Sequence, residues 1–76
     1  MKRFEVQFSY YTCGERASDT FHFSDEQAAR DKVAELRDVI EHNFAGCPTA
    51  EVVDEPGFFG IRDTSDGSFA RVTTNW

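Results

Sequence analysis

The chain has 76 residues, of which 39% are apolar, 29% are charged and 14% are aromatic. That length suits one domain spanning residues 1–76, and the many large apolar side chains exclude an intrinsically disordered chain. Fourteen acidic against eight basic residues give a formal charge of −6, which argues against direct binding to nucleic-acid phosphates.

The first predicted element is a β-hairpin over residues 3–23. Apolar and polar side chains alternate from Phe4 to Tyr11, which is the period of a strand with one buried face. Turn-forming residues follow from Gly14 to Asp19, and alternation resumes at residues 20–23. We therefore expect two strands joined by a loose tip at residues 14–19.

One amphipathic helix of about five turns is predicted next. Ser24 is the expected N-cap, with Gln27 three residues later in the position to bond back to the cap. Apolar side chains then recur at steps of three and four, and Gly46 occupies the place of a left-handed C-terminal cap, so the helix should end near Ala45. The expected apolar stripe consists of Ala29, Val33, Leu36, Ile40 and Phe44, widened by Ala28, Val39 and Ala45.

Three strand candidates follow the helix, at residues 50–54, 58–62 and 69–74. Pro56-Gly57 fits a type II turn between the first two. The resulting order, β-β-α-β-β-β, predicts an α+β fold in which a single helix packs on one face of an antiparallel sheet of four to five strands. The other face of the sheet is expected to face water.

The length of the last hairpin loop decides which side chains face outward. A two-residue or a four-residue loop makes facing positions sum to an odd number, so Phe59 and Ile61 would share a face with Ala70 and Val72. A three-residue loop with a bulge would instead bury Phe69. With the even loop lengths, the open face is predicted to carry Phe58, Arg62, Phe69 and Arg71, with Tyr11 joining from the first strand.

Catalytic and metal-binding patterns are absent from the sequence. Cys13 and Cys47 should lie at the same end of the domain, either as free thiols or as a bridge. His22 and His42 are isolated, and the run from Asp63 to Gly67 departs from a calcium loop in its glycine position, so we interpret it as a hairpin turn. We expect no enzyme activity, no metal and no cofactor.

The negative charge is distributed unevenly along the chain. Residues 1–24 are neutral, residues 25–45 hold six acids and three bases, and residues 46–76 hold five acids and two bases. This distribution either keeps a small domain soluble or steers it onto a basic partner. For the second interpretation the candidate contact residues are Glu51, Asp54, Glu55, Asp63, Asp66 and Asp31.

The open face supplies a second set of candidate contact residues. Tyr11, Phe58 and Phe69 beside Arg62 and Arg71 have the composition of a protein-interface hot spot. An ordinary cross-strand aromatic ladder explains the same residues equally well.

In size, acidity and build, the chain resembles the small phage-encoded inhibitors known as anti-CRISPR proteins. The resemblance rests on architecture and composition and carries over no functional residue. It implies a partner that is a basic protein or ribonucleoprotein complex, such as a CRISPR effector, whose nucleic-acid site the acidic groups would block. The alternative is an acidic, antitoxin-like or regulatory partner protein that acts by protein–protein association, either with another protein or as a homodimer. The N-terminal residues lack a signal-peptide pattern, so we expect a cytoplasmic location.

Overall fold

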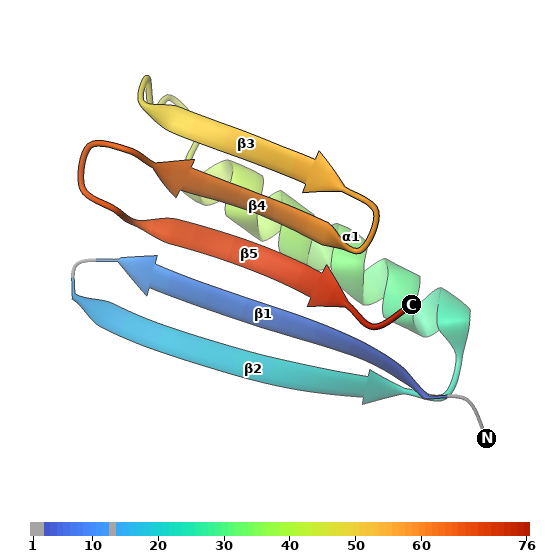
Figure 1. Cartoon of the computed structure of the whole chain (residues 1–76). Helices are drawn as coiled ribbons and strands as arrows, with labels where there is room; N and C mark the ends of the chain where they lie inside the picture. Colours follow the sequence, from blue (N-terminus) through green and yellow to red (C-terminus); the bar gives the residue numbers. More distant parts are fainter. Residues whose placement is uncertain (1–2, 13) are drawn as a thin grey trace.

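The computed structural model describes residues 3–12 and 14–76 and consists of one sheet and one helix. The elements are β1 (Phe4–Thr12), β2 (Glu15–Phe23), α1 (Glu26–Asn43), β3 (Ala50–Glu55), β4 (Phe58–Asp63) and β5 (Phe69–Thr74). The five strands form an antiparallel sheet in the order β2-β1-β5-β4-β3, with α1 across one face (Figure 1). The predicted α+β fold is therefore confirmed.

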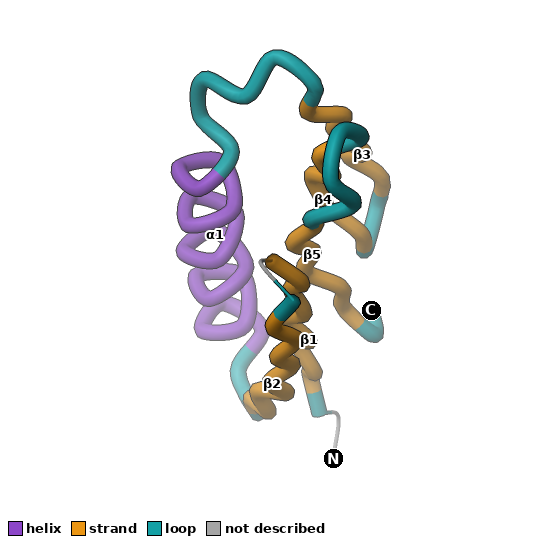
Figure 2. The backbone as a smooth tube through the Cα atoms, turned by 90° about the vertical axis from the view of Figure 1, so that its left-hand side faces the viewer, coloured by secondary structure: helices purple, strands orange, loops and turns teal. Residues whose placement is uncertain are grey.

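The last strand, β5, occupies the middle of the sheet. It pairs with β1 from Val6↔Thr74 to Tyr11↔Phe69 and with β4 on its other side. This pairing joins the β1–β2 hairpin to the β3–β4–β5 meander. Figure 2 shows α1 as a separate layer beside the sheet, with the opposite face of the sheet uncovered by any described element.

The core lies between α1 and the face of the sheet that it covers. The register Phe59↔Val72 and Ile61↔Ala70 confirms the odd-sum prediction, and all four side chains are buried. The connection from β4 to β5 explains this register, because Asp63 N–H bonds to Ser68 O at 2.8 Å and leaves four residues in the loop. The other buried apolar residues are Phe4, Val6, Ala29, Leu36 and Ile40.

The prediction of a loose hairpin tip is wrong. β2 begins at Glu15, which faces Thr12, so residues 15–19 belong to the strand, and Gly14 adopts a φ of 81°. Residues 15–19 are turn-forming by composition, but each of them pairs with β1. Ladder hydrogen bonds along β1 outweigh their weak strand propensity.

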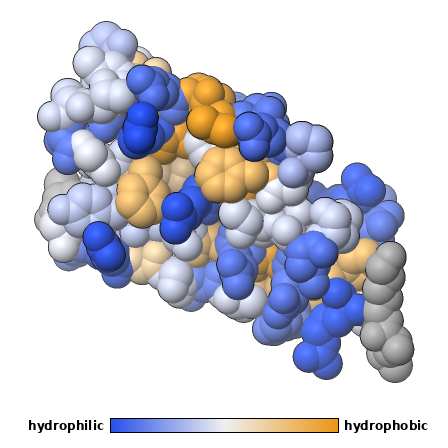
Figure 3. Space-filling view, in the orientation of Figure 1, coloured by the Kyte–Doolittle hydropathy of each residue, from blue (hydrophilic) through white to orange (hydrophobic). Residues whose placement is uncertain are grey.

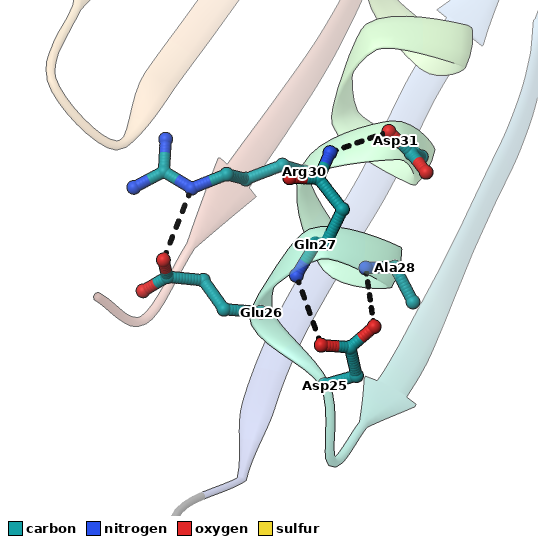
Figure 4. Close-up of polar contacts among 6 residues, drawn as sticks. All are labelled: Asp25, Glu26, Gln27, Ala28, Arg30 and Asp31. Carbon is teal, nitrogen blue, oxygen red and sulfur yellow. Dashed lines mark hydrogen bonds and ion pairs between the residues drawn. The ribbon is translucent and has the colours of Figure 1, made fainter.

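The N-cap prediction was also wrong by one residue. Asp25, not Ser24, caps α1, accepting hydrogen bonds from the backbone N–H groups of Gln27 at 3.4 Å and Ala28 at 3.3 Å (Figure 4). The side chain of Gln27 donates to Asp31 Oδ1 at 2.9 Å and does not return to the cap. Ser and Asp are both strong N-cap residues, so local sequence could not separate them.

The C-terminal end of α1 lies two residues before the predicted one. The helix ends at Asn43 with Phe44 as C-cap, and Gly46 has the expected positive φ, 77°. Val39 and Ala45 were expected to widen the apolar stripe, but both are exposed. The stripe is narrower because one helix contacts a sheet only along the side turned toward it.

Candidate protein-binding surfaces

The open face of the sheet is organised in rows, because residues that face each other in antiparallel strands share a side of the sheet. One row crosses all five strands, from Arg16 on β2 through Tyr11, Phe69 and Arg62 to Glu51 on β3. We call these five residues the arginine-aromatic row. It confirms that Tyr11, Phe69 and Arg62 share the open face.

Contacts within and beside the row hold its side chains against one another. The Arg16 guanidinium lies over the Tyr11 ring, 5.4 Å from its centroid, and the Tyr11 and Phe69 rings are 6.2 Å apart. Arg71, one row away, lies 5.1 Å from the Phe69 centroid. At the other end, Arg62 Nη2 is 2.9 Å from a carboxylate oxygen of Glu51.

A hollow of about 370 Å³ opens beside the row, over β3, β4 and β5. Its lining includes Phe58, Gly60, Phe69 and Arg71. A Cβ at Gly60 would lie 3.3 Å from the Phe58 ring and 3.2 Å from Arg71 Cβ, so a larger residue there would crowd both side chains. Val53, which faces Gly60 across the ladder, adds an exposed apolar side chain. Figure 3 shows this face, with apolar side chains gathered toward β3 and β4 among hydrophilic ones.

The charge of this part of the open face is opposite to that of the whole protein. The arginine-aromatic row and the neighbouring row that contains Arg71 hold three arginines and one glutamate. Glu55 lies further along the face, opposite Phe58. Glu5 and His22 form a separate contact of 3.3 Å between β1 and β2.

The outer side of α1 carries the second charged surface. Asp31, Glu35, Asp38 and Glu41 are all exposed. Their spacing places them on the side of the helix turned away from the buried Ala29, Leu36 and Ile40. We call these four acids the acidic helix face.

The basic side chains of this stretch of α1 turn back toward the sheet. Lys32 Nζ lies 4.4 Å from the centroid of the Phe21 ring on β2, and its side chain is only 25% exposed. The Arg37 guanidinium lies 4.2 Å from the Phe59 centroid, and its Nη2 is 3.0 Å from Asp54 Oδ2 on β3. Lys32 also forms an ion pair with one acid of the acidic helix face, because its Nζ lies 3.0 Å from Glu35 Oε2.

The acids that were predicted as one partner-binding set lie in three places. Glu51 and Glu55 are on the open face, and Asp31 and Asp54 are on the helix side, where Asp54 pairs with Arg37. Asp63 is the last residue of β4, and Asp66 lies in the loop that follows it. Clustering along the sequence therefore does not bring these six acids together.

Asp63 holds two loops together. Its carboxylate accepts hydrogen bonds from the Thr49 hydroxyl and from the backbone N–H and hydroxyl of Ser65, the latter two at 2.9 and 2.7 Å. These bonds, that of Thr49 foremost, lower the pKa of Asp63 from 3.8 to about 2. Asp66 accepts from Ser68 N–H at 2.8 Å. Both acids thus shape the β4–β5 loop, which is the turn that the sequence predicted.

The described part of the chain contains one cysteine, Cys47. Cys47 is a free thiol, 3.6 Å from the Thr49 hydroxyl. The predicted proximity of Cys13 to Cys47 lies outside the described residues. Within residues 3–12 and 14–76, no group of three or more His, Cys, Asp or Glu side chains is arranged to hold a metal ion.

Sequence reasoning missed three basic residues of these surfaces. Arg16 was assigned to the hairpin tip, although it belongs to β2 and faces Tyr11. Lys32 and Arg37 were counted as helix charges, and no local pattern indicates that they bend toward aromatic rings of the sheet.

Comparisons with known proteins assign no family. No family model, curated protein or solved structure matches the chain. Among the described residues, no helix combines the length and the apolar character needed to cross a membrane.

Proposed function

We propose that this protein is a non-enzymatic inhibitor whose acidic helix face binds a basic surface of a nucleic-acid-handling protein or ribonucleoprotein. The observation that carries the proposal is the separation of charge on α1, where Arg37 turns toward Phe59 and Lys32 toward Phe21. Lys32 pairs with Glu35, but the other three acids of the face, Asp31, Asp38 and Glu41, are exposed and form no ion pair with a described base. The resemblance to anti-CRISPR proteins suggests a CRISPR effector as the partner. This role would place the protein in the cytoplasm of the host cell.

The physical basis is electrostatic steering followed by occlusion. Acids on one helix face sum to a negative potential, which speeds encounter with a positively charged groove and weakens with salt. A groove lined by Lys and Arg binds nucleic acid through its phosphates, so an acidic protein seated there competes directly with guide or target strands. Asp38 and Glu41 are exposed, and neither side chain forms a hydrogen bond or an ion pair with another described residue, so they are the acids to change first.

The experiment measures target-DNA binding and cleavage by purified CRISPR effector complexes, with and without the protein. We expect inhibition that weakens as salt rises, and its loss in the variant Asp38→Lys with Glu41→Lys. The matched control is Glu15→Lys with Asp19→Lys, which changes the net charge equally at two exposed positions of β2. Absence of inhibition across effector types, or equal loss in both double variants, would contradict the proposal.

A second candidate is a regulatory or antitoxin-like protein that associates through β3. This strand lies at the edge of the sheet, and Val52 and Val53 are 59% and 44% exposed. An exposed apolar edge strand can pair with another chain. This function predicts a dimer of the isolated protein that Val52→Lys disrupts, and sedimentation as a monomer at high concentration would count against it.

A further inference from the structure

The part of the open face formed by the arginine-aromatic row and the row of Arg71 presents charge of the sign opposite to that of the acidic helix face. Arg16 and Arg71 are both exposed, and neither forms an ion pair with an acid among residues 3–12 and 14–76. Arg62, by contrast, is already paired with Glu51. Two arginines on this face therefore remain available to a partner.

The guanidinium groups of these two arginines lie against aromatic rings of the same face. Arg16 lies over Tyr11 and Arg71 over Phe69, and the two rings are neighbours. A ring contact covers one flat side of a guanidinium and leaves its N–H edge free. The free edge matches the two oxygens of a carboxylate, which an arginine fork binds through paired hydrogen bonds.

We propose that the arginine-aromatic row, with Arg71, binds an acidic segment of a partner protein. Arg16 and Arg71 would bind two of its carboxylates, and the hollow between Phe58 and Phe69 would receive an apolar side chain of the same segment. The inference is independent of the proposed inhibitor function, because it uses the open face of the sheet, not the acidic helix face, and a partner of opposite charge.

Two observations favour a carboxylate-bearing segment over single-stranded nucleic acid. Base stacking needs open ring faces, whereas the Tyr11 and Phe69 rings carry guanidinium groups. A polyphosphate chain would also approach a protein of net charge −6, and Glu51 and Glu55 flank the hollow on β3. A short segment with two acids and apolar neighbours avoids most of this repulsion.

The test is chemical-shift mapping on the ¹⁵N-labelled full-length chain. The probe is a synthetic eight-residue peptide that carries two acidic residues, Asp or Glu, beside Leu, Phe or Tyr. Its matched version carries Asn and Gln in place of the acids. We expect the acidic peptide, and not the amide version, to shift the backbone signals of Arg16, Tyr11, Phe69 and Arg71.

The affinity for the acidic peptide distinguishes the effect of specific arginine contacts from the effect of net charge. Replacing Arg16 and Arg71 with Gln should raise the Kd for the acidic peptide by about tenfold, as expected for losing two exposed charge contacts. The control, Arg30→Gln with Lys32→Gln, makes the same charge change on α1 and should leave the Kd within about twofold. Circular dichroism confirms that each variant is folded.

Several outcomes would overturn the inference. They are an absence of shifts on the row at millimolar peptide, an equal rise in Kd for both double variants, or stronger shifts from a single-stranded oligo(dT). Concentration-dependent shifts of the row without peptide would show instead that a second copy covers this face. The inhibitor proposal is judged separately, because its variants on α1 leave Arg16 and Arg71 unchanged.

Discussion

The position of Arg37 decides whether its charge is kept away from the acidic helix face, so Arg37→Gln tests the central structural observation. The substitution removes a ring contact of 4.2 Å to Phe59 and an ion pair of 3.0 Å to Asp54. Exposed cation–π contacts contribute about 0.5–1 kcal/mol and exposed ion pairs about 0.2–1 kcal/mol. The Arg37 and Asp54 side chains are 37% and 56% exposed, so solvent screens the pair and a total loss of about 1 kcal/mol is expected.

A double-mutant cycle divides this loss between the two contacts. Asp54→Asn removes only the ion pair, so it should cost less than Arg37→Gln, and the two changes together should show a coupling of about 0.2–1 kcal/mol. Urea and thermal unfolding followed by circular dichroism measure each variant. For a domain of this size, 1 kcal/mol corresponds to a fall in Tm of about 4–8 °C. The coupling should shrink at 1 M salt, because salt screens the ion pair.

Arg30→Gln is the matched control on the same helix. Arg30 pairs with Glu26 at 3.3 Å one turn away (Figure 4), so its loss should cost only about 0.3–0.5 kcal/mol. Wild-type stability of Arg37→Gln, together with no coupling to Asp54, would refute the reasoning. Arg37 would then extend into solvent and offset the charge of the acidic helix face.

Three further predictions concern the fold. Ile40→Ala should lower the free energy of unfolding by about 2–5 kcal/mol, because Ile40 is fully buried. Val39→Ala, at an exposed site, should change the free energy of unfolding by about 0.5 kcal/mol or less. Equal losses for the two variants in urea unfolding would contradict the placement of the helix. Asp63→Asn should lower the Tm at neutral pH. Because folding depresses the pKa of Asp63, its stabilisation is complete above 3.8 and disappears as the pH falls through about 2, so the Tm difference from wild type should close over that range. A Tm difference that persists in full at pH 2 would contradict stabilisation by the ionised Asp63 carboxylate. Gly57→Ala should cost roughly 1–2 kcal/mol, since Gly57 adopts a φ of 79°, and an unchanged urea midpoint would contradict this turn geometry.

The helix α1 shows which features the local sequence predicts and which it does not. Its existence and its buried stripe followed from the spacing of Ala29, Leu36 and Ile40, because a 3.6-residue period is a property of the helix itself. The exact N-cap residue could not be predicted, since Ser24 and Asp25 are nearly equivalent N-cap residues. The charge of the exposed side could not be predicted from composition either, because Lys32 and Arg37 move toward rings that are distant in sequence.

The candidate sites divide in the same way. The sequence placed Phe69 and Arg71 on the open face through a parity argument that needed only the loop between β4 and β5. It could not place Arg16 beside Tyr11, because the turn-forming composition of residues 14–19 concealed a strand that β1 stabilises by pairing. It also grouped acids by their nearness in sequence, although neighbouring strand residues such as Asp54 and Glu55 point to opposite faces.

The sequence by itself determined the order of the elements, the turn at Gly57 and the two faces of the last hairpin. Each of these follows from local backbone preferences or from a short repeat, which act within a few residues. Only the tertiary structure decided the strand order β2-β1-β5-β4-β3, with β5 at the centre. That order depends on pairing between segments some sixty residues apart, as in Tyr11↔Phe69, and it is what assembles the arginine-aromatic row.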